Sequence, residues 1–172
     1  MNRFRFDVKR AYQAVVKMLS QSSRVNIHTV MRAAYFADAG HMAEHGRPII
    51  GGHWRPMGLG PVNSELYELL EGALLQRLEL GVPSLPWKIR QTDGTVVNVA
   101  GTPFDERVFS KDELRHLEAG IDRAFRGDKE FGPAYRAALA SGADFIDYAG
   151  MAADGEVNGE VRGAEQIENA AA

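Results

Sequence analysis

Apolar residues recur at helical spacing in several stretches of the chain. In residues 8–19 they fall at positions i, i+4, i+7, i+8 and i+11, with most of the basic residues on the other side, which predicts an amphipathic helix. In residues 63–81 the leucines form a continuous apolar stripe that predicts one helix, with Asn63 as its N-cap and Gly81 at its end. These two stretches favour a mainly α protein.

Two further helices are predicted by the residues at their ends. Asn26 is a suitable N-cap for a helix that Gly46 ends, because glycine readily takes the left-handed conformation that closes a helix. The tetrapeptide Ser110–Glu113 has the spacing of a capping box, which predicts another helix that stops at Gly127. A short additional helix is expected near residues 131–139.

Two segments between the helices predict other structure. After Pro86 the apolar residues alternate, and Asp93-Gly94 between two alternating runs indicates a β-hairpin with Val97 and Val99 on one face. Residues 47–61 are rich in glycine and proline but also carry isoleucine and tryptophan, which indicates a structured crossing held in place by buried side chains.

The domain organisation follows from these elements. We expect a compact helical domain with a small β-hairpin over residues 1–150. Residues 151–172 are mostly alanine, glycine and acidic residues, with too few apolar side chains to offset the entropy of ordering. This composition predicts a flexible acidic C-terminal tail.

Composition excludes several classes of function. The chain has no cysteine, which excludes disulfides, thiolate metal sites and a cysteine nucleophile. It has no secretory-type N-terminal pattern and no apolar run of bilayer length, so we expect a cytoplasmic protein without a membrane partner. Basic residues concentrate in the first twenty positions. A solvated helix face is the favoured interpretation, and a nucleic-acid-binding regulator remains an alternative.

The sequence contains few candidates for catalysis or metal binding. Asp38, His41 and His45 are spaced to share one helix face and could join His53 around a metal ion. A local Asp38–His41 hydrogen bond is the favoured alternative, so we expect no metal and no cofactor. No nucleophile elbow or phosphate-binding loop is present, and we do not expect an enzyme.

Other side chains suit contacts within the protein or with a partner. Arg47 could pair with a carboxylate, for which Asp38 is the favoured internal partner. Several residues are of types enriched in protein interfaces, although Trp54 fits the core better than a contact. These candidate partner-binding residues are Trp54, Arg55, Met57, Tyr67 and Trp87.

One group of positions resembles a known family. The group is Tyr35, Phe36, Asp38, His41, Gly46, Arg47, Pro48, Gly60, Pro61 and Val62. These residues are similar to those of the Panacea domain, the SocA-like antitoxin family of bacteria and phages, with a resemblance that spans residues 8–126. The matching positions mainly define the scaffold and do not identify the surface that binds a partner.

The resemblance implies a fold and a function. The implied fold is mostly helical with a small β element. The implied function is neutralisation of a cognate protein toxin by direct binding. Some relatives instead deliver the toxin to an ATP-dependent protease, so a proteolytic adaptor is the first alternative and an ATP-dependent protease a second expected partner. The role of the C-terminal tail is left open.

Overall fold

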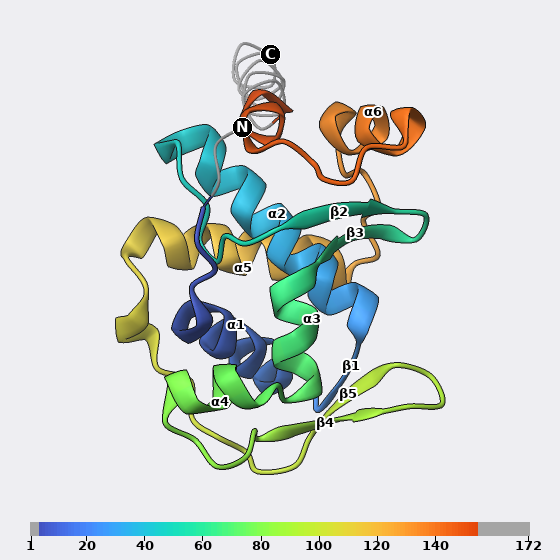
Figure 1. Cartoon of the computed structure of the whole chain (residues 1–172). Helices are drawn as coiled ribbons and strands as arrows, with labels where there is room; N and C mark the ends of the chain where they lie inside the picture. The colour runs from blue at the N-terminus through green and yellow to red at the C-terminus, as the bar shows by residue number, and fades with distance from the viewer. Residues whose placement is uncertain (1–3, 155–172) are drawn as a thin grey trace, which may run out of the picture.

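Two crossing helices, α2 (Ile27–His45) and α5 (Lys111–Phe125), form the centre of the computed structural model, which describes residues 4–154 (Figure 1). Gly120 of α5 lies at the crossing, where a Cβ atom would come within 2.6 Å of the Ala33 carbonyl oxygen and 2.8 Å of the Ala37 nitrogen. The two backbones therefore approach so closely that only glycine fits.

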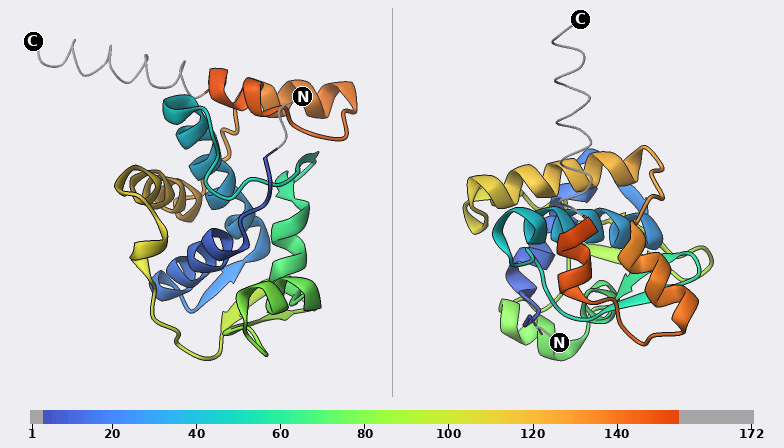
Figure 2. Two further views of the ribbon diagram at one scale, coloured as in Figure 1. Left: turned by 60° about the vertical axis from the view of Figure 1, so that its left-hand side comes forward. Right: turned by 90° about the horizontal axis from the view of Figure 1, so that it is seen from above.

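The other helices surround this pair. They are α1 (Val8–Gln21), α3 (Ser64–Glu71), α4 (Leu74–Leu80), α6 (Pro133–Ser141) and a helical segment at residues 148–154, with a 3-10 turn at Glu106–Val108. Helix α1 contacts α2, α3 and α4, whereas α6 lies beside the β2–β3 hairpin on another side of α2 (Figures 1 and 2). The prediction of a mainly α fold is confirmed.

The structure confirms the helix ends that were predicted from capping residues. The Asn26 side chain accepts the His28 N–H at 2.8 Å, and Gly46 ends α2 with φ +70°. Ser110 and Glu113 form both hydrogen bonds of the capping box at the start of α5. Helix α1 buries the predicted apolar face, and Asp7 caps its first turn. These contacts satisfy backbone groups that helix ends otherwise leave without partners.

The helix predicted over residues 63–81 is wrong as one element. Asn63 does cap α3, but Gly72 takes a left-handed conformation with φ +82° and ends it. The chain restarts as α4, and none of the residues of α4 is buried. The leucine pattern continues across Gly72, whereas the change of direction at this residue turns the second half of the stripe toward solvent.

Two small antiparallel sheets complete the fold. The predicted hairpin pairs β4 (Trp87–Arg90) with β5 (Thr95–Asn98), and β1 (Arg24–Asn26) adds an unpredicted third strand in the order β1-β5-β4. The second sheet, β2 (Trp54–Met57) with β3 (Gly60–Asn63), lies in the predicted crossing.

The predicted face of the first hairpin is wrong. Val96 is buried and Val99 is 55% exposed, because Val96 lies directly opposite Ile89 and opposite Val25. Residues opposite each other in a sheet share a face. Asp93-Gly94 ends a four-residue connection rather than forming a two-residue turn, and this sets a different register.

The ordered chain extends past the predicted boundary at residue 150. Residues 148–154 are helical, the Met151 side chain is fully buried, and Asp154 Oδ2 accepts the Ala134 N–H at 2.8 Å. The rest of the predicted acidic tail lies outside the described residues. Within residues 4–154, no helix combines the length and the apolar character needed to cross a bilayer.

The helix crossing gives a direct test. Gly120→Ala should lower the free energy of unfolding by about 1–3 kcal/mol through overpacking, although alanine normally favours a helix over glycine by about 1 kcal/mol. Chemical denaturation measures this change. Gly58→Ala is the matched control because a Cβ at Gly58 meets nothing within 4 Å. A Gly120→Ala variant as stable as the parent would show that the crossing is looser than described.

Candidate protein-binding surface

Asp38 connects helix α2 to the segment of residues 47–61 that follows it. Its carboxylate is fully buried and accepts the backbone N–H groups of Ile49 at 2.8 Å, Ile50 at 2.9 Å and Gly51 at 3.3 Å. It also accepts the indole N–H of Trp54 at 3.1 Å. A single side chain of α2 therefore fixes the path of the chain into β2.

The charge state of Asp38 reflects two opposing effects. Burial raises the pKa of Asp38 to about 7, and the four donated hydrogen bonds keep it from rising further because they favour the anion. All four partners are donors, so the carboxylate has no acceptor to which a proton could be donated. The buried group is suited to anchoring backbone rather than to exchanging protons with a ligand.

The predicted Arg47–Asp38 pair is wrong. Backbone amides and Trp54 occupy the carboxylate, and Arg47 Nη1 lies 3.7 Å from Glu113 Oε2 instead. The predicted Asp38–His41 hydrogen bond is also absent from the described contacts of these residues, because His41 Nδ1 is bonded to the Arg47 carbonyl oxygen at 2.6 Å. Backbone groups of residues 47–51 therefore take the places that the two predicted side-chain pairs would have needed.

Glu113 is the second buried carboxylate of the scaffold. It caps α5 with Ser110, and Arg10 Nε of α1 lies 2.8 Å from its Oε2 in an ion pair. Burial raises the pKa of Glu113, but the Ser110 N–H and the Arg10 guanidinium outweigh this and lower it below the usual range. The residue therefore ties α1 and the chain after α2 to the start of α5.

The hypothetical metal site of Asp38, His41, His45 and His53 is not assembled. Asp38 and His41 have the partners given above, and His53 pairs with Glu65. Ligand atoms of Glu44, His45 and Asp112 do lie within 4.8 Å of one another. Sequence spacing does not reveal this group, because α5 supplies Asp112.

Ion pairs account for the Glu44 group. Glu44 is bonded to Arg115 and His116, each at 2.5 Å, and the hydrogen bond from Arg115 lowers the pKa of Glu44 to about 2. His45 Nε2 lies 3.1 Å from Asp112 Oδ2. Arg115 and the two histidine side chains thus already contact these carboxylates.

Two of the candidate partner-binding residues are buried. Trp54 is 1% exposed and packs edge-on against Tyr35, with ring centroids 5.2 Å apart. Trp87 is 3% exposed and donates its indole N–H to the Leu70 carbonyl oxygen at 3.1 Å. Both tryptophans belong to the core and are not available at the surface.

The remaining candidates are exposed. Met57 is 48% exposed, Tyr67 is 42% exposed, and Arg55 is also exposed. Met57 lies beside the two-residue turn of the β2–β3 hairpin, Gly58-Leu59, in which Leu59 is 65% exposed. We call Met57, Gly58 and Leu59 the hairpin tip.

A second exposed apolar feature lies on α4. Leu74, Leu75 and Leu78 are 60%, 79% and 66% exposed and share one helix face, which we call the α4 ridge. Two of the three polar residues of α4 bond to nearby backbone, whereas Glu79 is exposed: Gln76 donates to the Glu65 carbonyl oxygen at 2.9 Å, and Arg77 donates to the Gly72 carbonyl oxygen at 2.9 Å. Three of the four leucines of α4 therefore face solvent, whereas an amphipathic surface helix usually buries its apolar side chains.

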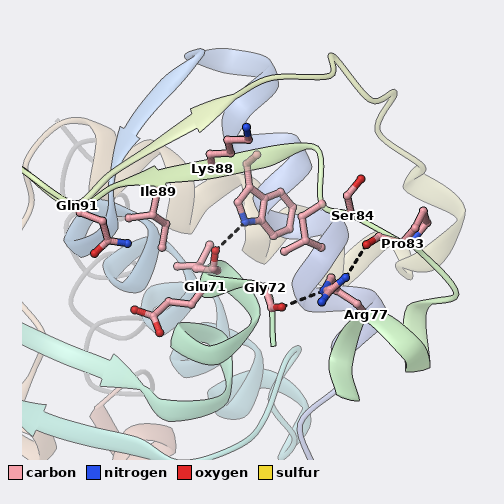
Figure 3. Close-up of a pocket in the computed structure, with 11 residues that line it drawn as sticks. Glu71, Gly72, Arg77, Pro83, Ser84, Lys88, Ile89 and Gln91 are labelled. Carbon is pink, nitrogen blue, oxygen red and sulfur yellow. Dashed lines mark hydrogen bonds between the residues drawn. The ribbon is translucent and has the colours of Figure 1, made fainter. Parts of the chain in front are cut away.

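A groove of about 540 Å³ lies between the end of α3, the connection after α4 and β4, and Figure 3 shows the residues that line it. Trp87 and Leu70 form part of its apolar lining, and Glu71 and Lys88 add opposite charges at its edge. Arg77 closes one end with hydrogen bonds to Gly72 and Pro83. The groove has no cluster of convergent catalytic groups among these lining residues.

Comparison with known proteins identifies the family. The model for the antitoxin SocA-like, Panacea domain matches residues 30–123, which is more than half of the chain. The chain therefore belongs to this family of antitoxin-like proteins, and the resemblance found in the sequence is confirmed. No curated protein and no solved structure matched the chain.

Replacing Asp38 tests the anchor. Each oxygen of Asp38 accepts two N–H groups, so in Asp38→Asn the amide NH2 faces two donors in either orientation. We therefore expect the free energy of unfolding to fall by about 2–4 kcal/mol. Urea denaturation measures it. Asp122→Asn, at a mostly exposed position on α5, is the control and should change stability by less than about 0.5 kcal/mol. Equal effects of the two substitutions on stability would contradict the claim that the hydrogen bonds of Asp38 stabilise the fold.

The raised pKa of Asp38 predicts a pH dependence. A folded-state pKa of about 7 exceeds the unfolded value of 3.8, so the folded protein binds the proton more tightly between these values. The stability that this group contributes is full at low pH and falls as pH rises toward 7. The difference in unfolding free energy between the parent and Asp38→Asn should therefore shrink from pH 5 to pH 7. A difference that grows with pH would place the folded-state pKa below 3.8.

Proposed function

We propose that this chain is the antitoxin of a toxin–antitoxin pair and that it neutralises a cognate protein toxin by direct binding. The observation that carries the proposal is the family match over residues 30–123. The exposed apolar side chains of the hairpin tip and the α4 ridge support it, because contiguous exposed apolar surface commonly marks protein interaction sites.

The polar side chains considered for catalysis or metal binding are held by contacts within the protein, which also supports a binding function. Asp38, Glu113 and the histidines that the sequence suggested for chemistry are occupied by backbone groups or ion pairs within the scaffold. Nothing in these contacts requires a substrate. A rigid body that presents a surface to another polypeptide fits this arrangement better than a catalytic site does.

The basic N-terminal residues give little support to nucleic-acid binding. Arg10 pairs with Asp7 and Glu113, Lys17 lies 3.4 Å from Glu118, and Arg5 lies 3.4 Å from Glu79. Acidic side chains thus already neutralise much of the positive charge that would be needed to bind the phosphates of a nucleic acid. The protein toxin remains the favoured partner.

Co-expression tests the proposed function. The protein encoded beside this chain should arrest growth when expressed alone, and this chain should restore growth and co-purify with it. Unchanged arrest together with the absence of a complex would contradict the proposal.

The same strains separate blocking from proteolytic delivery. Blocking leaves the half-life of the toxin unchanged or longer, whereas an adaptor shortens it only when the ATP-dependent protease is present. A pulse–chase measurement of the toxin in parent and protease-deficient cells gives the answer.

A further inference from the structure

We propose that the hairpin tip is the surface that binds the toxin, and that it takes an apolar segment of the toxin that carries acidic side chains. This inference rests on the proposed function and specifies the surface and the chemistry of the partner. It depends on three features of the tip, which are its rigidity, its exposed apolar side chains and the arginines around it.

Contacts from two helices hold the backbone of the tip. Tyr135 of α6 donates its hydroxyl to the Met57 carbonyl oxygen at 2.5 Å, and Arg32 of α2 donates to the Leu59 carbonyl oxygen at 2.7 Å. Beneath the tip, a Cβ atom at Gly60 would lie 3.2 Å from the Phe131 ring. The turn is therefore fixed from both sides before any partner arrives, which lowers the entropy cost of binding.

Pairing within the hairpin adds to this rigidity. Pro56 lies opposite Pro61, and Met57 lies opposite Gly60 across the two-residue turn. Hydrogen-bonded and non-hydrogen-bonded pairs alternate along an antiparallel ladder. The two prolines thus occupy a pair that needs no N–H donor, and they restrict the backbone directly behind the tip.

The exposed side chains of the tip are apolar where turns usually carry polar residues. Met57 and Leu59 are 48% and 65% exposed although their carbonyl groups have partners in the fold. Leu139 of α6 lies one helical turn beyond Tyr135 and is 42% exposed. Nothing in the packing of the turn requires methionine and leucine at these positions, so their role is best explained by contact with an apolar partner.

Arginines surround the tip. Arg55 lies two residues before Met57 on the same face of β2, Arg32 contacts the turn itself, and Arg136 follows Tyr135 on α6. Within residues 4–154, Arg55 makes no ion pair. Arg136 lies 3.6 Å from Glu130, with both side chains more than half exposed, and its charge also acts on the Asp154 carboxylate. Arginine and methionine are enriched at interfaces, and the positive charge complements carboxylates of a partner.

The α4 ridge lacks a comparable signature. Its leucines are 60–79% exposed, but the groove next to α4 carries the opposite charges of Glu71 and Lys88, and Glu79 of α4 already lies 3.4 Å from Arg5. The charges around the ridge therefore do not select a partner. For this reason the ridge serves as the internal comparison in the experiment rather than as the proposed site.

The test measures binding of the protein encoded beside this chain to purified variants of the full chain. Leu59→Ser should raise the dissociation constant about tenfold or more, whereas Leu75→Ser on the α4 ridge should change it less than about threefold. Both side chains are mostly exposed, so circular dichroism and thermal melts should match those of the parent.

A charge pair of variants tests the acidic partner. Arg55→Glu should weaken binding about tenfold or more and reduce the dependence of the association rate on salt. Arg126→Glu changes the net charge equally but lies at the end of α5, with its side chain 70% exposed, so it should have less than about a threefold effect. Equal effects of the two reversals would indicate a general charge effect and overturn the acidic partner.

The remaining outcomes separate this inference from the proposed function. If the parent binds and neutralises the toxin but Leu59→Ser binds equally well, or Leu75→Ser is the weaker binder, the hairpin tip is not the site while the antitoxin function stands. If the parent neither binds nor neutralises that protein, both fail. A dimer of the parent that Leu59→Ser converts to a monomer would assign the tip to self-association and overturn the inference.

Discussion

The rest of the structure depends on the four hydrogen bonds that Asp38 accepts at the centre of the molecule. They join α2 to residues 49–51 and to Trp54, which are 11 to 16 positions away along the chain. A buried carboxylate is costly unless donors surround it, so the chain after α2 has one favourable path. That path begins β2 and sets the direction in which the hairpin tip points.

The scaffold and the proposed binding surface are thus parts of one arrangement. The Gly120 crossing brings α2 and α5 together, and Glu113 joins α5 to α1 and to Arg47 directly after α2. Arg32, on the same helix as Asp38, holds the far end of the hairpin. The antitoxin function that we propose for this member of the SocA-like family requires a stable surface more than it requires reactive groups, and the rigid body supplies such a surface.

Local signals predict much of the fold, and long-range contacts decide what they do not. Asn26, Gly46 and the Ser110–Glu113 capping box act within a few residues, so the sequence alone predicts them. The break at Gly72 cannot be seen in the sequence because the leucine pattern continues across it. Only packing in the fold turns the leucines of α4 toward solvent.

The prediction of an Arg47–Asp38 pair fails for a related reason. Side-chain charges are visible in a sequence, whereas the backbone amides that reach Asp38 are not. The sequence indicates the exposed tip only at Arg55 and Met57, since no local pattern distinguishes an exposed leucine from a buried one.

Hydrogen exchange of the backbone amides, with and without the bound toxin, tests the central claim most directly. A preformed surface on an Asp38-anchored scaffold predicts slow exchange at Ile49 and Ile50 in the free protein. Addition of the toxin should then slow exchange at Gly58 and Leu59 and leave Ile49 and Ile50 unchanged. Fast exchange at Ile49 and Ile50 in the free protein, or new protection confined to α4, would contradict the account.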